Sequence, residues 1–259
     1  MDRKTKIIAT VGPSLSSESK IKKIIDTGAN VLRINFSHGT LEDHENVISW
    51  ARKSNMQVAI MQDIQGPKIR TGISSENTFL EKSKNVTLTN IETESNNDIV
   101  FINYENLLRD VNVDDRVFID DGQIVLKVVE KENDKLEALI LIGGELRDNQ
   151  GVAFPDSNLS VSAITEKDIE HLKFGSEHDV DFVAVSFVRN ASDINLVKDI
   201  ISKDVKVIAK IELKTALDNI DEILDVADGV MVARGDLGVQ LPLEQVPFVQ
   251  KQILDAANK

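Results

Sequence analysis

Short apolar runs alternate with amphipathic segments in the first and last parts of the chain, and this alternation constrains the fold more than any other feature. The runs are rich in valine and isoleucine, and they span residues 5–11, 29–36, 57–63, 181–189, 205–212 and the stretch that begins at 229. Each is followed by a segment with helical periodicity, which is typical of buried parallel strands in β/α units. The sequence therefore predicts an α/β fold, and in a barrel of such strands the carboxyl ends open onto one face.

Helix signals support this order of elements. Ser16 or Ser17 can cap the first helix, and Gly28 stands where its C-terminal glycine belongs. Thr165 is placed to cap a helix over residues 166–178. Further helices are expected over residues 41–55, 192–204 and 243–259.

The last two apolar runs both end in charged residues: Lys210, Glu212, Arg234 and Asp236. The second pair lies in an expected turn that is marked by Gly235 and Gly238. Glu212 and Asp236 suit a hard divalent cation such as Mg²⁺, which takes one or two carboxylates plus water and substrate oxygens. Lys210 beside such a cation suits phosphoryl transfer or enolate formation. The alternative is a surface ion pair for Lys-x-Glu and a plain turn for Gly-Asp-Leu-Gly.

A second polar set follows the run over residues 29–36. Arg33, Asn35 and Ser37 alternate with apolar residues, so all three point to one side of the strand. Polar side chains on the inner side of an otherwise apolar strand are costly unless bonded, which indicates a ligand site. The alternative is an edge strand with its polar face in water. We expect His38, in the turn that follows, to be structural.

The pattern of apolar residues changes between residues 73 and 158. Asp63 ends the third apolar run, and Gly66-Pro67 breaks regular structure soon after it. From residue 73 the chain shows short alternating runs separated by Asn, Asp and Gly, which predicts a small antiparallel β domain. We expect residues 1–72 and 159–259 to form the β/α part, with 73–158 inserted as a lid over the site. Asp121 lies in an expected turn, from which it can reach a closed site.

Composition excludes several classes of protein. The chain has 259 residues, no cysteine and a formal net charge of −13. Disulfide scaffolds and thiolate catalysis are excluded, and nucleic acid is not expected as a partner, because phosphate backbones are bound by basic surfaces. No run is long enough to span a membrane, so we expect a soluble, cytoplasmic protein with no membrane partner. An anionic substrate can still bind where basic side chains gather at strand ends: Arg33, Arg70, Lys210 and Arg234.

A set of motifs resembles the pyruvate kinase family, in order and with suitable spacing over essentially the whole chain. The motifs are TKIIATVGP, NVLRINFSHGT, DIQGPKIRTG, FIDDGQIVL, LSVSAITEKD, DFVAVSFVRNASD, VIAKIE and GVMVARGDLGV. The resemblance implies a TIM-type β/α barrel with a small antiparallel β-barrel lid inserted after the third strand. It also implies transfer of a phosphoryl group from phosphoenolpyruvate to ADP, giving pyruvate and ATP, with Mg²⁺ or Mn²⁺ and with K⁺.

The same resemblance implies catalytic roles. Glu212 and Asp236 look like ligands of the divalent cation. Lys210 looks like the cation that stabilises the transferring phosphoryl group, because a fixed charge needs no reorganisation as the bond breaks. Arg33 looks like a phosphate contact, and Arg70, at the hinge of the lid, like a residue that contacts nucleotide phosphate or acts in closure.

It further implies binding roles. The K⁺ ligands would be Asn35, Ser37, Asp63 and the carbonyl of Ile64. The backbone of Ala233, Arg234 and Gly235 would bind the substrate carboxylate, and Arg33, Lys210 and Asp236 would be further substrate-binding residues. Asp121 resembles a lid residue of the closed site. The sequence departs from the family pattern at Gln240, where glutamate is usual, and at Leu213, where asparagine often follows Lys-Ile-Glu.

The resemblance covers only about six of the eight β/α units of such a barrel. The last two strands and a C-terminal domain have no counterpart in this sequence, and six strands leave two open edges. We expect a truncated product, one chain of a split enzyme, or an oligomer that covers its own edges.

Two other functions stay open at this stage. One is a metal-dependent aldolase or lyase that acts on pyruvate or phosphoenolpyruvate without nucleotide. The other is a non-enzymatic pseudoenzyme or partner subunit; loss of Lys210 or of both carboxylates would favour it, and the sequence keeps all three.

Overall fold

A curled sheet of six parallel strands forms the larger part of the protein. The computed structural model describes residues 4–55 and 57–259. The strands are β1 (Ile8–Val11), β2 (Val31–Asn35), β3 (Ala59–Ile64), β12 (Phe182–Val185), β13 (Lys206–Ile211) and β14 (Gly229–Val232). They pair in the order β1-β2-β3-β12-β13-β14, and every pair is parallel. The predicted β/α arrangement, with an incomplete barrel, is confirmed.

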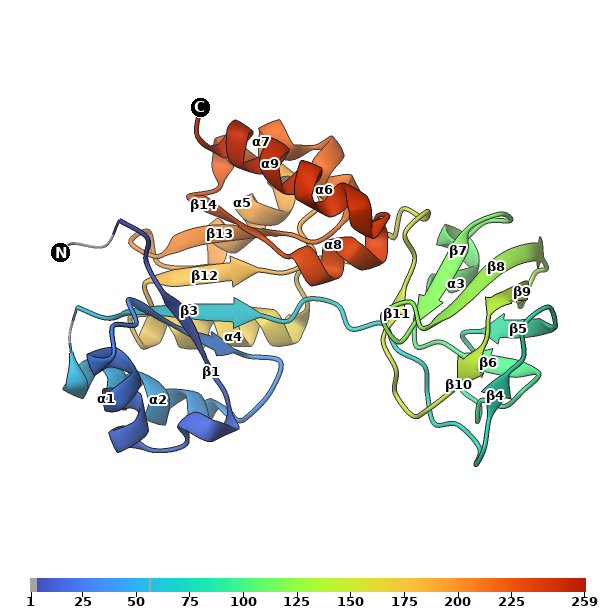
Figure 1. Cartoon of the computed structure of the whole chain (residues 1–259), viewed down its shortest axis with the longest axis horizontal. Helices are drawn as coiled ribbons and strands as arrows, with labels where there is room; N and C mark the ends of the chain where they lie inside the picture. The colour runs from blue at the N-terminus through green and yellow to red at the C-terminus, as the bar shows by residue number, and fades with distance from the viewer. Residues whose placement is uncertain (1–3, 56) are drawn as a thin grey trace.

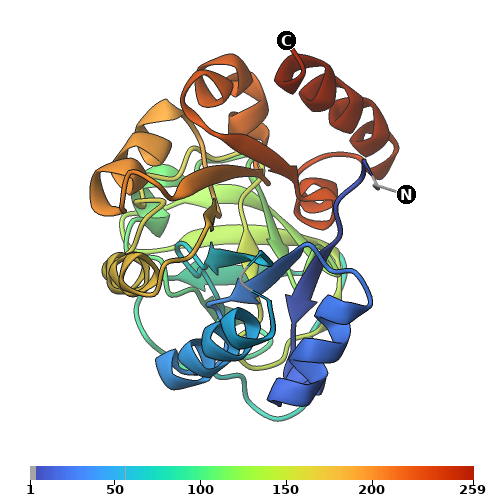
Figure 2. The same ribbon diagram turned by 90° about the vertical axis from the view of Figure 1, so that its left-hand side faces the viewer.

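The longer helices lie around the outside of this sheet (Figure 2). In chain order the helices of this part are η1 (Pro13–Leu15), α1 (Glu18–Asp26), α2 (Leu41–Ser54), α4 (Glu166–Glu177), α5 (Ala191–Ile200), α6 (Lys214–Asp218), α7 (Ile220–Val226), α8 (Arg234–Gln240), η2 (Leu243–Gln245) and α9 (Val246–Ala257). Thr40 and Thr165 form capping boxes at the starts of α2 and α4, where each hydroxyl accepts a hydrogen bond from a backbone N–H three residues on. Gly28 follows α1 with a φ of 112°, as expected of a C-terminal glycine.

Two local predictions need correction. Ser17 is the N-cap of α1, but its side chain makes no capping hydrogen bond. Gly235 and Gly238 lie inside helix α8 rather than at the borders of a turn. Leu237, between them, is fully buried, and its packing outweighs the weak helix propensity of glycine.

The inserted part is a second sheet beside the carboxyl ends of the parallel strands (Figure 1). Its strands are β5 (Asn85–Thr89), β6 (Ile99–Phe101), β7 (Arg116–Ile119), β8 (Ile124–Lys131), β9 (Leu136–Ile142) and β11 (Val152–Ala153), in the order β11-β7-β8-β9-β5-β6. A short ladder of β4 (Phe79–Leu80) with β10 (Gly144–Glu145) and the helix α3 (Leu107–Asp110) complete it.

This second sheet is mixed, so the prediction of a purely antiparallel domain was wrong at one pair. Strands β5 and β6 run parallel, because the chain crosses between them through residues 90–98 instead of turning back in a hairpin. The barrel form is confirmed. Arg70 bridges to Gly151 beside β11, and Thr71 bridges to Ile102 beside β6, so this segment joins the two edges of the sheet.

Each part has its own hydrophobic core. The first core joins the parallel strands to the helices, with Leu32 and Ile60 fully buried. The second core lies in the inserted barrel around Leu88 and Leu126, and Leu159 of the returning chain packs against it. The predicted limits of the inserted part, 73 and 158, stay a prediction. In the part of the chain that the structure describes, no helix has the length and apolar character needed to cross a membrane.

Candidate active site

A cavity of about 660 Å³ lies between the carboxyl ends of the parallel strands and the inserted barrel. The parallel sheet contributes polar residues from four of its strand ends or the turns that follow them: Arg33, Asn35, Ser37, Asp63, Ser186, Lys210 and Glu212. The inserted barrel contributes Phe118, Asp121 and the segment around Phe154. Residues far apart in the sequence therefore line one cavity, as expected of the carboxyl face of a β/α barrel.

Lys210, at the end of β13, is the centre of a buried polar cluster. Its ammonium lies 2.8 Å from Glu212 Oε1 and 3.2 Å from Asp63 Oδ1, and it donates a 2.6 Å hydrogen bond to Ser186 Oγ. These three acceptors match the three N–H donors of an ammonium group. The Ser186 hydroxyl in turn donates to the carbonyl of Ile64 at 2.8 Å. The side chain of Lys210 is thus fixed at the base of the cavity.

Asp63 bridges this cluster to a second cation. Its Oδ2 accepts a 2.6 Å hydrogen bond from Arg33 Nε, and Arg33 Nη2 lies 2.5 Å from the same oxygen. Arg33 Nη1 donates to the Thr10 hydroxyl at 2.9 Å. The carboxylate of Asp63 is almost fully buried, so its charge is compensated by Arg33 on one side and Lys210 on the other.

Burial and charge set the protonation of the central pair. Burial disfavours the ammonium of Lys210, but the carboxylates of Glu212 and Asp63 outweigh it and raise the pKa of Lys210. Burial raises the pKa of Glu212, and Lys210 and the N–H of Phe187 oppose this effect only in part. The charge of Asp236 pushes the pKa of Glu212 in the same direction as burial. A cation bound beside Glu212 and Asp236 would stabilise the charged form of Glu212 and so oppose the effects of burial and of the Asp236 charge on its pKa.

The donor set fits a divalent cation that takes most of its ligands from substrate and water. Glu212 is buried and Asp236 is exposed at the start of α8, and both line the cavity. Among the described residues no group of three or more His, Cys, Asp or Glu side chains is placed to hold a metal. Two carboxylates next to an open cavity suit Mg²⁺ or Mn²⁺, which are commonly held by one or two protein carboxylates together with phosphate oxygens.

Each of the predicted K⁺ ligands has an oxygen atom that can bind a cation. Asn35 and Ser37 line the cavity, as the alternation along β2 predicts, and the Asn35 side chain accepts a hydrogen bond from the Ser37 N–H at 3.0 Å. Asp63 is engaged by Arg33 and Lys210, and the Ile64 carbonyl by Ser186. Oxygen donors of this kind suit a hard cation, and their roles stay predictions.

Arg70 and Asp121 reach the cavity from the side of the inserted barrel. Arg70 Nη1 donates to the carbonyl of Asn149 at 2.7 Å, while its Nε is buried without a hydrogen-bond partner. Asp121 is exposed and has a φ of 54°, in the left-handed region that aspartate tolerates in turns. Both side chains line the cavity.

The expected convergence of Arg234 on the site was wrong. Arg234 is exposed and does not line the cavity, and neither do Ala233 and Gly235. Because the chain enters helix α8 at Arg234, residues 234 and 236 lie two positions apart on a helix and face different sides. Asp236 therefore lines the cavity without Arg234.

The turn after β12 contributes site residues that the sequence analysis did not single out. Ser186 bonds Lys210, the N–H of Phe187 donates to Glu212 Oε2 at 2.9 Å, and Arg189 lines the cavity. The run DFVAVSFVR was recognised as a strand, but its polar residues were given no role. A serine and an arginine at the carboxyl end of a buried strand are the signal that could have identified them.

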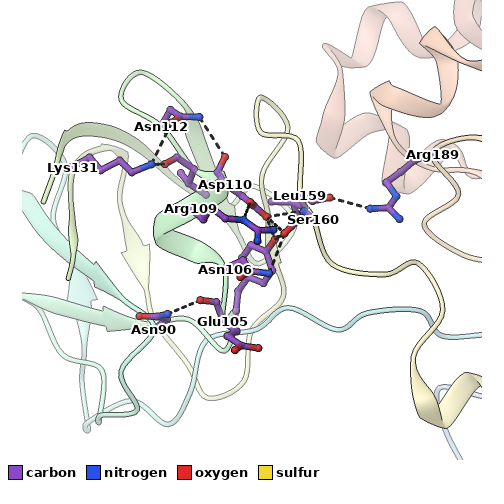
Figure 3. A network of polar contacts seen from close by, with 12 residues as sticks. Asn90, Glu105, Asn106, Arg109, Asp110, Asn112, Lys131, Leu159, Ser160 and Arg189 are labelled. Atoms are coloured by element: carbon purple, nitrogen blue, oxygen red, sulfur yellow. Dashed lines mark hydrogen bonds and ion pairs between the residues drawn. The ribbon is translucent and has the colours of Figure 1, made fainter. Parts of the chain in front are cut away.

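The segment that returns from the inserted barrel is held from both sides (Figure 3). Arg189 Nη1 donates to the carbonyls of Leu159 and Val161 at 3.0 and 2.7 Å, while the rest of its guanidinium binds the carboxylate of Asp193. Between those carbonyls, the N–H and hydroxyl of Ser160 donate to Asp110 Oδ2 at 2.7 and 2.6 Å. Residues 159–161, the return strap, thus connect the turn after β12 to helix α3.

Comparisons with known proteins show which family the sequence matches. The family model described as the pyruvate kinase barrel domain matches residues 2–259. The pyruvate kinase of Thermotoga maritima is 44% identical over 260 residues, which cover 97% of this chain and 56% of that protein. The pyruvate kinase of Staphylococcus aureus strain MRSA252 is 43% identical over 267 residues, covering 99% of this chain and 46% of that protein. The chain spans about half the length of the curated relatives it matches.

Proposed function

Because the chain belongs to the pyruvate kinase family, we propose that it transfers the phosphoryl group of phosphoenolpyruvate to ADP, giving pyruvate and ATP. The observation that carries the proposal is the cluster around Lys210, whose ammonium lies 2.8 Å from Glu212 at a cavity that Asp236 also lines. A fixed positive charge beside carboxylates that can hold a metal is what phosphoryl transfer requires, since charge shifts onto the transferring and leaving oxygens in its transition state.

Each residue of the cluster then has a task. Lys210 stabilises the transferring phosphoryl group, and Arg33 contacts the oxygens of that group. Asp63 holds the side chains of Lys210 and Arg33 in place. Glu212 and Asp236 would hold Mg²⁺ or Mn²⁺, which when bound supplies positive charge to the phosphate and enolate oxygens.

The remaining assignments follow the resemblance. Asn35, Ser37, Asp63 and the Ile64 carbonyl would hold K⁺. Arg70, whose Nε is buried without a partner, would bind nucleotide phosphate when the inserted barrel closes as a lid, with Asp121 approaching the site. For the substrate carboxylate, the backbone of residues 233–235 stays our candidate.

We also propose a place in glycolysis, a cytoplasmic location and association with a second copy or a complementing chain. Neither nucleic acid nor a membrane is proposed as a partner. The pseudoenzyme is not favoured, because Lys210, Glu212 and Asp236 all line the cavity, and the lyase is not favoured, because the relatives described above are pyruvate kinases.

The test is pyruvate formation coupled to lactate dehydrogenase, with phosphoenolpyruvate, ADP, Mg²⁺ and K⁺. Lys210→Met is compared with Lys206→Met, a matched control on the same strand whose side chain is 56% exposed. We expect Lys210→Met to lose at least about a hundredfold in rate, because it removes a preorganised charge, and Lys206→Met to keep the wild-type rate. Equal rates in the wild type and Lys210→Met, or pyruvate formation independent of ADP, would contradict the proposal.

A further inference from the structure

Phe187, in the turn after β12, has a left-handed backbone conformation. Its φ is 56°, whereas the other non-glycine residues with positive φ in the described part of the chain are all Asn, Asp or Ser: Asn77, Ser83, Asp114, Asp120, Asp121, Asn149 and Asp179. Short polar residues tolerate this region, but a bulky aromatic residue there is a genuine outlier. Such strain persists only where surrounding contacts impose it, and it gathers at functional sites.

The contacts that impose the conformation come from the site itself. The N–H of Phe187 donates to Glu212 Oε2 at 2.9 Å, and the preceding residue, Ser186, is fixed between Lys210 and the Ile64 carbonyl. The following residue, Val188, is fully buried. The backbone of Phe187 is therefore held on both sides while its N–H faces the carboxylate.

The ring of Phe187 rests on a second left-handed residue. Gly66 has a φ of 69°, and a Cβ at that position would lie 2.8 Å from Phe187 Cδ2. Only glycine leaves room for the ring there. The aromatic side chain is thus packed against the chain that leads into the inserted barrel, which helps to hold the strained backbone.

We propose that Phe187 is a positioning residue for Glu212. Its left-handed backbone aims the N–H at one carboxylate oxygen, so that the other oxygen is presented to Lys210 and the cavity. Groups that orient a metal ligand in this way are worth about 10- to 100-fold in metal affinity. The inference rests on the proposed function, because it assumes that Glu212 and Asp236 hold a divalent cation.

The test compares substitutions that differ in tolerance for the left-handed region. Phe187→Asn and Phe187→Thr both replace the ring by a small polar side chain, but asparagine adopts positive φ readily and β-branched threonine does not. Phe187→Gly and Phe187→Ala form a second pair that differs by one methyl group. Binding of Mn²⁺ alone to the full chain is measured by electron paramagnetic resonance of the free ion, with Glu212→Gln as the reference for loss of the site.

We expect Phe187→Asn and Phe187→Gly to bind Mn²⁺ within about threefold of the wild type, and Phe187→Thr and Phe187→Ala to bind about tenfold more weakly. Thermal melts identify variants that keep the native fold, and if Phe187→Thr does not fold, the glycine and alanine pair decides. Equal affinities within the pairs would overturn the role of Phe187 while leaving the metal site intact. Wild-type binding that Glu212→Gln does not weaken would overturn both the metal site and the inference.

Discussion

Four charged side chains at the base of the cavity compensate one another. Lys210 contacts Asp63 and Glu212, and Arg33 contacts Asp63, so two cations meet two carboxylates. Breaking a buried pair by removing one partner costs about 3–5 kcal/mol, because the other charge is left uncompensated. Loss of activity in a variant of this cluster therefore has to be separated from loss of stability.

The stability of the protein also depends on Gly66, because this residue has a backbone conformation that other residues rarely adopt. We predict that Gly66→Ala lowers the free energy of unfolding by about 2 kcal/mol, because alanine is unfavourable at positive φ. The new Cβ would also lie 2.8 Å from the ring of Phe187, which must then move. Urea denaturation followed by circular dichroism measures the change.

The matched control is Gly12→Ala. Gly12 has a φ of −124°, which alanine adopts freely, and a Cβ there would have no heavy atom within 4 Å. We expect this variant to stay within about 0.5 kcal/mol of the wild type. If Gly66→Ala is equally neutral, the close packing of Phe187 on Gly66 is contradicted.

Side chains that follow strand periodicity could be predicted from the sequence. The alternation along β2 correctly brought Arg33, Asn35 and Ser37 to one side, and the end of β13 identified Lys210. The role of Phe187 could not be predicted, because it depends on the backbone N–H and on a positive φ. A positive φ is usually signalled in a sequence by glycine, and this position holds phenylalanine. Sequence patterns report side-chain faces and turn residues, not the direction of a single peptide group.

At the scale of elements, helices α2 and α4 meet through buried histidines around one aromatic ring. The ring of Phe36, just after β2, lies 4.1 Å from that of His44 and 5.1 Å from that of His171, measured between centroids. Burial lowers the pKa of both histidines, and the mutual repulsion of the two lowers that of His44 further. The interface is therefore built for neutral imidazoles.

Stability should fall as this interface is acidified. Because the folded-state pKa of His44 lies below its unfolded value of about 6.5, the unfolded chain binds the proton first as pH falls. The contribution of the neutral His44 imidazole to the free energy of unfolding is fully present above about pH 6.5. It is lost as the pH falls below that value, by at most about 1.4 kcal/mol per pH unit for one histidine. We predict that His44→Gln flattens this dependence between pH 7.5 and 5.5, as measured by urea denaturation.

The difference between variant and wild type is the quantity that tests this prediction. Glu212, whose pKa is raised, acts in the opposite direction, because the folded state then binds the proton more tightly. That contribution is common to both proteins and cancels. His38→Gln, which changes an exposed histidine, serves as the control and should keep the wild-type slope. An unchanged slope in His44→Gln would show that burial does not hold that imidazole neutral.

Elements with strong periodicity were predictable, and those set by packing were not. The parallel strands and the helices α2 and α4 follow from apolar runs and capping residues. Helix α8 was missed, because two glycines in seven residues indicate a turn unless the burial of Leu237 is known. The parallel pair β5–β6 was also missed, since strand direction depends on the path of the connection rather than on the strands.

At the scale of the molecule, two separate cores are joined by two chain segments. The change from helical to alternating periodicity predicted this division, but not how the parts are fastened together. On the return strap, Arg189 binds from the parallel-sheet side and Asp110 from the inserted barrel. Burial opposes the charge of Asp110, but hydrogen bonds from Ser160 and Tyr104 hold its pKa well below the usual range, so it stays an acceptor at neutral pH.

We predict that Arg189→Lys loosens the return strap without unfolding either core. Lysine keeps the charge but lacks the planar fork, so it cannot bind both carbonyls of the strap and the carboxylate of Asp193 together. Hydrogen exchange followed by mass spectrometry should show residues 159–163 exchanging about tenfold faster, since a hydrogen bond to a charged group is worth about 1.5–3 kcal/mol. Exchange in β2 should not change.

Two further variants make this result specific to the strap. Asp110→Asn weakens the hydrogen bonds that Ser160 donates to residue 110 of the inserted barrel. It should speed exchange in the same peptide. Arg147→Lys changes an exposed arginine of the inserted barrel that pairs with Asp120 and not with a strap residue, and it should leave the peptide at the wild-type rate. If Arg189→Lys exchanges no faster than Arg147→Lys, the strap does not fasten the two parts. If it does exchange faster, the turn after β12 fastens the inserted barrel to the parallel-sheet part through Arg189, two residues from Phe187, whose N–H binds Glu212.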